Sequence, residues 1–313
     1  MLTILRLLLA YAVPTVIGYC LIVLLERGKV QLAAGERWAL GFALGSGVLT
    51  YFMFYLGFLG LPLTFWTSSA AFWPCLLLAG LTRRRRAGKV EGLPLQPGAL
   101  SDQGKSGRYL AIFLGVLLAG KLASISYTIA VSPTYFDDSV SFWNLKGKVY
   151  YHHKSIILDE SHPDFLGAKN PHYPNGIPLF KTWIGLSLNR WSDRLVNSNT
   201  FFYYLCLGLV FYYCLRPFLS TAVAFPLTYG LLSLPLLVFS AGFAYFDIVI
   251  GLYFLGATAY LYRWIREERT IYLILSASFG AVGLGVKEEM MVLGAAGAIP
   301  LLFLGQMAKG WKI

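Results

Sequence analysis

Two consecutive stretches decide the fold class: TRRRRAGKVEGLPLQPGALSDQGKSGR at 82–108 and YLAIFLGVLLAGKLASISYTIAV at 109–131. The second is an almost uninterrupted apolar run, and about 20 such residues form a helix that crosses the roughly 30 Å hydrocarbon core of a bilayer. The first is rich in Arg and Lys, as cytoplasmic loops of membrane proteins are. Together they predict a membrane span that leaves a basic inner loop.

Eight further apolar runs extend this pattern along the chain. Because each is flanked by charged or turn-forming residues, we expect about nine transmembrane helices in an all-α polytopic membrane protein. The predicted spans are 3–25, 38–59, 63–81, 109–131, 199–215, 219–240, 246–263, 270–286 and 290–306. They form a single transmembrane domain over 1–313, with three helices in 1–81, a basic cytoplasmic loop at 82–108, an outer loop at 132–198 and five helices in 199–313.

The composition agrees with a membrane protein and excludes other classes. Of the 313 residues, 57% are hydrophobic and 13% are charged, and the mean hydropathy is +0.61. A water-soluble globule could not cover that much apolar surface, and a disordered chain would be far more polar. The net charge of +11 suggests nucleic acid at first, but its distribution along the chain gives it another meaning.

The charges separate by predicted side of the membrane. With 82–108 placed inside, alternation of the spans also places 26–37, Arg216, 263–269 and the C-terminal tail inside, and these segments hold the excess of Lys and Arg. The outer segments are nearly neutral. The positive charge therefore sets topology and does not indicate a nucleic-acid partner. We expect a plasma (inner) membrane protein with its N-terminus outside and its C-terminus in the cytoplasm.

The outer segment 132–198 is unlike a plain connector, because it mixes acids, cations, aromatic residues and all the histidines. From Asp138 the spacing of Phe142, Leu145 and Val149 predicts a short helix. We expect this helix, and a second one at 176–195, to lie on the membrane surface. Aromatic residues at headgroup depth, such as Trp143 and Tyr150 in the first and Trp183 and Trp191 in the second, would anchor them.

Acidic residues from three separate segments are predicted to meet on the outer face. They are Asp137 and Asp138, Asp247 at the start of a span, and Glu288 with Glu289 between the last two spans. Charges at these depths are costly unless they are paired or face a wet cavity. Three cations join them, namely Lys146, Lys148 and Lys287.

Such a cluster suits transfer of a group from a phosphate. A carboxylate whose pKa is raised by a neighbouring acid can accept a proton from an attacking hydroxyl. An ammonium can neutralise the charge that develops on a phosphate leaving group. No phosphate-cradling glycine loop that ends in Lys-Ser or Lys-Thr occurs in the sequence, which argues against a nucleotide-driven reaction.

The order of these motifs resembles the GT-C superfamily of polyprenyl-phosphate-sugar-dependent glycosyltransferases, and most of all its protein-mannosyltransferase-like and aminoarabinose-transferase-like members. The resemblance covers about 130–290. It rests on Asp138 with Trp143 five residues later, Lys146-Gly147-Lys148, Tyr173-Pro174 with Pro178, Tyr245-Phe246-Asp247, and Lys287-Glu288-Glu289. Departures are Gly147 where alanine is usual, Met290 where glycine is common, and three helices before the motif loop where many relatives have one.

The resemblance implies a role for each candidate residue. Asp138 would be the general base, and Asp137 the neighbour that tunes or orients it. The lipid phosphate would be bound by Lys146 and Lys287, with Lys148 as a third candidate. The sugar or acceptor would be bound by Trp143, His172, Tyr173, Asp247 and Glu289. The reaction would be an inverting displacement at the anomeric carbon.

The implied partners are a polyprenyl-phosphate-linked sugar donor, membrane lipids and an acceptor that is a glycan, a lipid or a protein. No cofactor is required. A divalent metal held by His152, His153, His162 or His172 with nearby carboxylates is an alternative, although their spacing matches no common metal motif. The alternative functions are a lipid-linked glycan polymerase or ligase, a transporter, and a non-catalytic membrane subunit. A transporter is expected to place its ionisable groups near the midplane instead.

Overall fold

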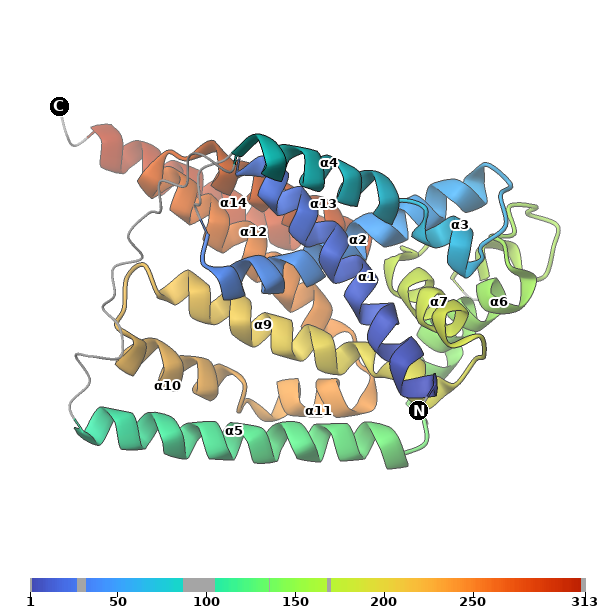
Figure 1. The fold of residues 1–313 in the computed structure, drawn as a ribbon, viewed down its shortest axis with the longest axis horizontal. Coiled ribbons are helices and arrows are strands. Elements are labelled where there is room, and N and C mark those ends of the chain that lie inside the picture. The colour runs from blue at the N-terminus through green and yellow to red at the C-terminus, as the bar shows by residue number, and fades with distance from the viewer. Residues whose placement is uncertain (1, 27–31, 87–104, 135, 168–169, 311–313) are drawn as a thin grey trace.

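The computed structural model describes residues 2–26, 32–86, 105–134, 136–167 and 170–310, and this part of the chain is helical throughout, without strands (Figure 1). Five helical segments are long and apolar enough to cross a membrane. They are α1 (Leu2–Leu25), α2 (Ala34–Phe58), the apolar part of α5 (Lys105–Val131), α8 (Asp193–Asn197) continued by α9 (Asn199–Leu215), and α12 (Asp247–Glu267). The chain is therefore a helical protein of the multi-pass membrane type.

A sixth span is formed if α10 (Thr221–Leu231) and α11 (Pro235–Phe243) are counted together, since they meet at 62° across a short break. Pro235 has no backbone N–H and cannot continue the helical hydrogen bonding of α10. The carbonyl of Leu232, at the break, accepts hydrogen bonds from the Tyr204 hydroxyl and from Nζ of Lys121, at 3.2 Å for the lysine. Lys121, the one cation in the middle of α5, thus caps a broken helix.

Three further predicted spans differ in detail from the helices observed. The run at 63–81 divides into α3 (Phe65–Ser69), whose first turn is capped by the Thr64 side chain, and α4 (Phe72–Arg86). The last two spans correspond to α13 (Thr270–Leu284) and α14 (Glu289–Gly310), whose apolar parts are shorter than those of the other spans. Most of the predicted basic loop at 82–108 lies outside the described residues.

The outer segment contains the π-helix η1 (Asp138–Asn144), then α6 (Leu145–His153), the 3₁₀ turn η2 (Phe165–Gly167), α7 (Gly176–Leu188) and the short α8. The helices predicted from Asp138 and in 176–195 are present. Trp143, Tyr150 and Trp183, predicted to anchor these helices at headgroup depth, are instead buried within the protein. Every residue of α7 from Ile177 to Leu188 is buried, packed against α1, α2 and α6.

The helix ends sort to two ends of the molecule as the alternation of spans requires. The outer segment lies with the N-terminus at one end of Figure 1, where the Trp183 indole donates to the Ala10 carbonyl at 2.8 Å. At the other end, Arg263 near the end of α12 pairs with Glu36 at the start of α2 at 2.7 Å. Both groups of this pair are buried. Since α12 rises about 1.5 Å per residue, this pair lies about 24 Å along the helix from Asp247.

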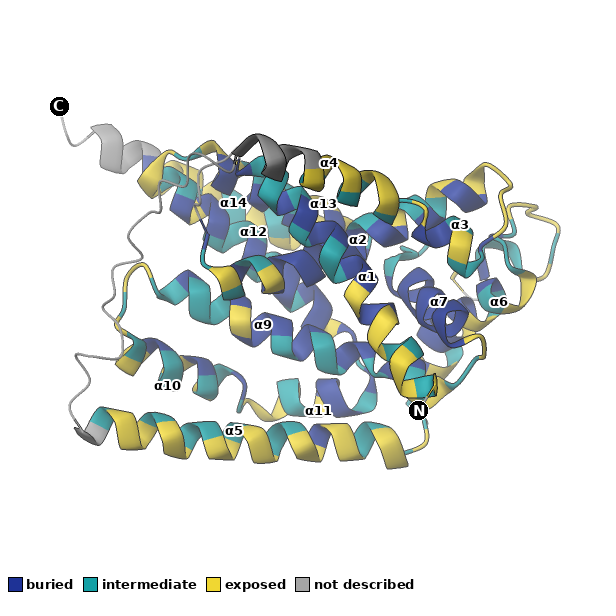
Figure 2. Ribbon diagram, viewed as in Figure 1, coloured by how far each residue is buried: buried dark blue, intermediate teal, exposed yellow. Residues whose placement is uncertain are grey.

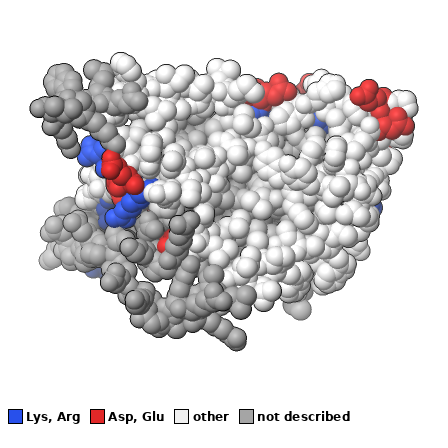
Figure 3. Space-filling view, turned by 90° about the horizontal axis from the view of Figure 1, so that it is seen from above, with Lys and Arg blue, Asp and Glu red and all other residues white. Residues whose placement is uncertain are grey.

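The surface between these ends is apolar. Most residues of α5 are exposed (Figure 2), although they are hydrophobic, as expected of a helix that faces lipid. On the face shown in Figure 3, charged side chains gather at the left end and in the right half, with an uncharged band between them.

Candidate functional site

A turn-rich segment, residues 170–176, leads into α7 and lines one side of the site; we call it the strap. Three carbonyl oxygens of the strap, those of Asn170, Pro171 and Tyr173, accept hydrogen bonds from Lys146 Nζ at 3.2, 3.4 and 3.1 Å. At its other end the Gly176 amide donates to the Gly285 carbonyl at 2.9 Å. The strap is thus tied both to α6 and to the end of α13.

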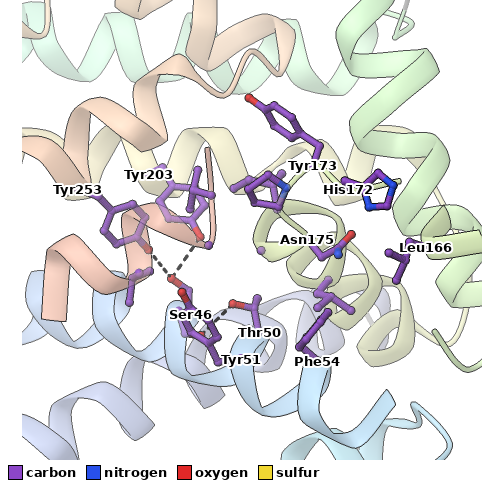
Figure 4. Close-up of a pocket in the computed structure, with 18 of the residues that line it drawn as sticks. Ser46, Thr50, Tyr51, Phe54, Leu166, His172, Tyr173, Asn175, Tyr203 and Tyr253 are labelled. Atoms are coloured by element: carbon purple, nitrogen blue, oxygen red, sulfur yellow. Dashed lines mark hydrogen bonds between the residues drawn. The ribbon is translucent and has the colours of Figure 1, made fainter. Parts of the chain in front are cut away.

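Between the strap and the spans lies a cavity of about 320 Å³ (Figure 4). This volume is at the small end of the range found for ligand pockets. Its walls come from α2, the strap, the start of α7, α9, α12 and α13. Lining residues are Ser46, Gly47, Thr50, Tyr51, Phe54, Leu166, Pro171, His172, Tyr173, Pro174, Asn175, Gly176, Ile177, Leu179, Tyr203, Tyr253, Val282, Gly285 and Val286. His172 and Tyr173, predicted from the sequence to line a sugar pocket, are both in its wall.

Charged residues surround Tyr173 at the rim of this cavity. The Tyr173 hydroxyl donates to Glu289 Oε2 at 3.2 Å, and Lys287 Nζ lies 2.6 Å from Asp247 Oδ1. Burial of the ring, and then the charges of Glu289, Glu288 and Asp247, raise the pKa of Tyr173. The Asp247 side chain remains 57% exposed and that of Lys287 18%, so this ion pair is accessible to a ligand.

Aromatic rings also pack against Tyr173. Phe142 and Trp143 of η1 contact the Tyr173 ring with centroid separations of 5.0 and 5.7 Å, and Trp143 also lies 5.4 Å from Phe246. Trp143 therefore shares one packed cluster with Tyr173 and with the residue that precedes Asp247. Of the acids and lysines predicted to converge, the structure pairs Asp247 with Lys287 and brings Glu289 beside them through Tyr173. Lys146 is turned to the strap carbonyls instead.

Asp137 and Asp138 are exposed at the start of η1. The Asp137 carboxylate accepts a hydrogen bond from Ser141 Oγ at 2.7 Å. The next residue after Asp138, Ser139, is buried and donates to the Ala244 carbonyl at 2.9 Å. This contact holds the start of η1, where Asp138 is exposed, against the segment that leads into Asp247.

The two lysines of the Lys-Gly-Lys motif have different surroundings. Lys146 is fully buried, and burial lowers its pKa to about 8. Because an ammonium has three protons, its three carbonyl contacts leave none for a phosphate in this arrangement. Lys148 is exposed on the same helix. Gly147, between them, is buried, and an added Cβ would lie 2.9 Å from the Pro178 carbonyl.

Sequence reasoning missed one buried lysine beside the site. Lys181 of α7 donates to the side-chain oxygens of Asn144 and Asn197, and its Nζ lies 4.6 Å from the centroid of the Phe246 ring. Burial lowers its pKa well below the ordinary value for lysine. In the sequence, Lys181 is a cation within the apolar segment 176–195, and this pattern predicted a helix on the membrane surface. Its partners come from η1 and α8 and could not be paired with it by spacing.

The histidines do not gather around a cation site in the described part of the chain. His153 contacts Asp164 at 2.9 Å, and His162 accepts from the Asp164 amide at 3.0 Å. His172 lies instead at the cavity wall. Among the described residues, no group of three or more His, Cys, Asp or Glu side chains is placed to hold a metal ion.

Fold and site together define a helical, membrane-embedded protein with an internal cavity beside a cluster of acids and a lysine. No protein-family model, curated protein or solved structure matches the chain. Its function therefore has to be argued from the geometry of the site.

Proposed function

We propose that this chain is a membrane glycosyltransferase that moves a sugar from a polyprenyl-phosphate donor to an acceptor hydroxyl. The observation that carries the proposal is the position of Tyr173, which forms a wall of the cavity and also bonds to Glu289 beside the Asp247–Lys287 pair. A pocket for the transferred group and a set of charges for the leaving phosphate are thus adjacent.

In this proposal Lys287 contacts the donor phosphate. The Lys287 ammonium faces the carboxylate of Asp247 at the rim of the cavity. The Lys146 ammonium, by contrast, faces backbone carbonyls of the strap. A phosphate oxygen can compete with Asp247 for it, since Asp247 is largely exposed. The ammonium would then neutralise charge that develops on the phosphate as the sugar leaves.

The bond changes of the proposed reaction balance without a cofactor. The acceptor oxygen attacks the anomeric carbon as the bond from that carbon to the phosphate oxygen breaks, with inversion. Asp138 takes the acceptor proton, and polyprenyl phosphate leaves with the electron pair. Asp138 suits this role because it is exposed at the start of η1, which Ser139 holds against the segment that leads into Asp247. General-base contacts of this kind contribute about 10²–10⁴-fold.

The test is transfer by the purified full chain with Asp138→Asn. The matched control is Asp159→Asn, which removes another exposed carboxylate of the outer segment, one that bonds only to Ser161 in the described structure. We expect Asp138→Asn to lower the transfer rate at least 100-fold without a change in unfolding temperature, and Asp159→Asn to leave the rate unchanged. Equal rates for the two variants would refute the role of Asp138.

We also propose that the cavity end of the molecule faces the outside of the plasma membrane. Support comes from the excess of Lys and Arg in the segments at the opposite end. A cysteine placed at the exposed Asn170 should react with an impermeant maleimide on intact cells, whereas one at Gly88, outside the described residues, should react only after permeabilisation. The reverse labelling pattern would contradict this orientation.

A further inference from the structure

The described residues that line the cavity carry no carboxylate, ammonium or guanidinium group. Its 19 residues include no Asp, Glu, Lys or Arg. A carboxylate or phosphate inside would lose part of its hydration without gaining a counter-charge from this lining, which is unfavourable. Among the described residues, Lys287 at the rim is a cation that could neutralise an anion.

The hydroxyl groups of Ser46, Tyr203 and Tyr253, at the deep end of the cavity, donate their protons to other groups of the protein. A hydroxyl has one proton to donate and lone pairs that accept. The Tyr253 hydroxyl donates to the Ala43 carbonyl at 2.8 Å, and Ser46 donates to the same carbonyl at 3.0 Å. The Tyr203 hydroxyl donates to Ser46 Oγ at 3.2 Å. Each of these three oxygens can therefore accept a hydrogen bond from a ligand but has no proton left to donate.

Two further hydroxyls of the lining show the same pattern. Thr50 donates to the Gly47 carbonyl at 2.9 Å, and Tyr51 donates to the Ala281 carbonyl at 2.7 Å. The wall contributed by α2, α9 and α12 therefore presents acceptor oxygens and aromatic rings. It is suited to a ligand that brings its own hydrogen-bond donors.

The opposite wall supplies donor groups. The side-chain oxygen of Asn175 accepts a hydrogen bond from Tyr150 at 2.8 Å, which orients its amide nitrogen as the group left for other partners. His172 lies on the same side. Figure 4 shows Asn175 and His172 across the cavity from Ser46, Tyr203 and Tyr253. A ligand whose hydroxyls both donate and accept could satisfy the two walls at once.

We propose that the cavity binds an uncharged, hydroxylated ring whose O–H groups donate to Ser46, Tyr203 and Tyr253, and that it discriminates against acidic and cationic sugars. An aliphatic chain would use none of these acceptors. The inference rests on the proposed function, in that it names a neutral sugar as the group transferred, with the donor phosphate outside the cavity at Lys287.

The test is a binding measurement that requires no turnover. The probes are neutral propyl glycosides of gluco, manno, galacto and xylo configuration, the propyl glucuronide and galacturonide, and the propyl 2-amino-2-deoxyglucoside. Each is titrated by calorimetry into the full chain in phosphatidylcholine nanodiscs. We expect at least one neutral glycoside to bind at least tenfold more tightly than the charged analogues. Failure of every neutral glycoside to bind, or tighter binding of a uronide or of the amino sugar, would overturn the proposal.

Two variants locate the binding within the cavity. Tyr203→Phe and Tyr253→Phe each remove one acceptor, and at about 1 kcal/mol per hydrogen bond each should weaken the neutral glycoside about fivefold. Tyr204→Phe is the matched control, because its hydroxyl bonds to the Leu232 carbonyl outside the cavity. Equal affinity in all three variants would refute the assigned contacts.

These results separate the two proposals. If the neutral glycosides fail to bind while Asp138→Asn still abolishes transfer, the ligand assignment falls and the reaction stands. If binding follows the cavity variants while Asp138→Asn retains transfer, the general base is wrong and the ligand assignment stands.

Discussion

Replacement of Lys287 by methionine separates a structural role of this residue from a functional one. Its ion pair with Asp247 is 2.6 Å long, but the Asp247 side chain is 57% exposed. Partly exposed pairs contribute about 0.2–1 kcal/mol to stability because water and salt screen them. Lys287→Met should therefore lower the unfolding free energy by no more than about 1 kcal/mol.

The expected functional loss is much larger. A charge-assisted hydrogen bond is worth about 1.5–3 kcal/mol, and a tenfold change corresponds to 1.4 kcal/mol. Loss of the contact between Lys287 and the donor phosphate should thus weaken binding of polyprenyl monophosphate about 10- to 150-fold. The same factor is expected in kcat/KM, because that constant compares the transition state with free enzyme and substrate.

The assay is equilibrium binding of polyprenyl monophosphate to wild-type protein, Lys287→Met and Asp247→Asn in nanodiscs, with unfolding temperatures measured in parallel. Asp247→Asn removes the carboxylate that competes with phosphate for Lys287, so binding should stay the same or become tighter. If Asp247→Asn weakens binding as much as Lys287→Met does, Lys287 serves only to pair with Asp247, and the assignment of the phosphate site is refuted.

Three further predictions concern the buried Lys146 and the ion pair between Arg263 and Glu36 at the opposite end of the molecule. Lys146→Met leaves three strap carbonyls without their donor. Hydrogen exchange of residues 170–176 should accelerate at least fivefold, because one lost hydrogen bond of about 1 kcal/mol corresponds to about that factor. Lys148→Met, two residues along, should not change it. Burial lowers the pKa of Lys146 from 10.5 to about 8, so between these pH values the unfolded chain binds more protons than the folded one. The unfolding free energy should therefore rise with pH from about 8 to 10.5. A smaller rise in Lys146→Met would confirm Lys146 as the source, and identical pH curves for the two proteins would exclude it. Arg263→Met leaves the buried Glu36 unpaired and should lower the unfolding free energy by about 3–5 kcal/mol in chemical denaturation. The loss should be smaller when Arg263→Met is combined with Glu36→Gln. Equal losses in the single and double variants would contradict a direct pairing.

The rim of the site could be predicted from the sequence because helix ends obey a simple rule. Spans that cross a membrane alternate in direction, so Asp247 at the start of one span and Lys287 and Glu289 between two others must reach the same side. The structure confirms that they meet, with Tyr173 and Trp143 beside them. This deduction needed only the order of apolar runs along the chain.

The outer segment could not be resolved in the same way. An apolar helix with a lysine and tryptophans has one pattern whether it lies on a bilayer or inside a protein. For α7 the outcome depended on packing against α1, α2 and α6, which buried Lys181 and Trp183. The same limit applies to Lys146, whose carbonyl partners lie 24–27 residues further along the chain.

The cavity was also beyond reach of the sequence. Its deep wall combines Ser46, Tyr203 and Tyr253, which come from three apolar helices distant in the chain. Hydroxyl residues are common inside membrane helices, where they bond to the preceding turn. Only their juxtaposition marks these three as a binding surface.

The measurement that tests the account most directly is sugar transfer by the purified wild-type chain in nanodiscs, with a polyprenyl-monophosphate-linked neutral sugar as donor. We predict release of one polyprenyl phosphate for each sugar transferred, and inversion at the anomeric carbon. Sugar transfer with retained configuration would contradict the single displacement. Absence of transfer across neutral donors and across protein, lipid and glycan acceptors, by protein that is folded and membrane-inserted, would contradict the proposed function itself.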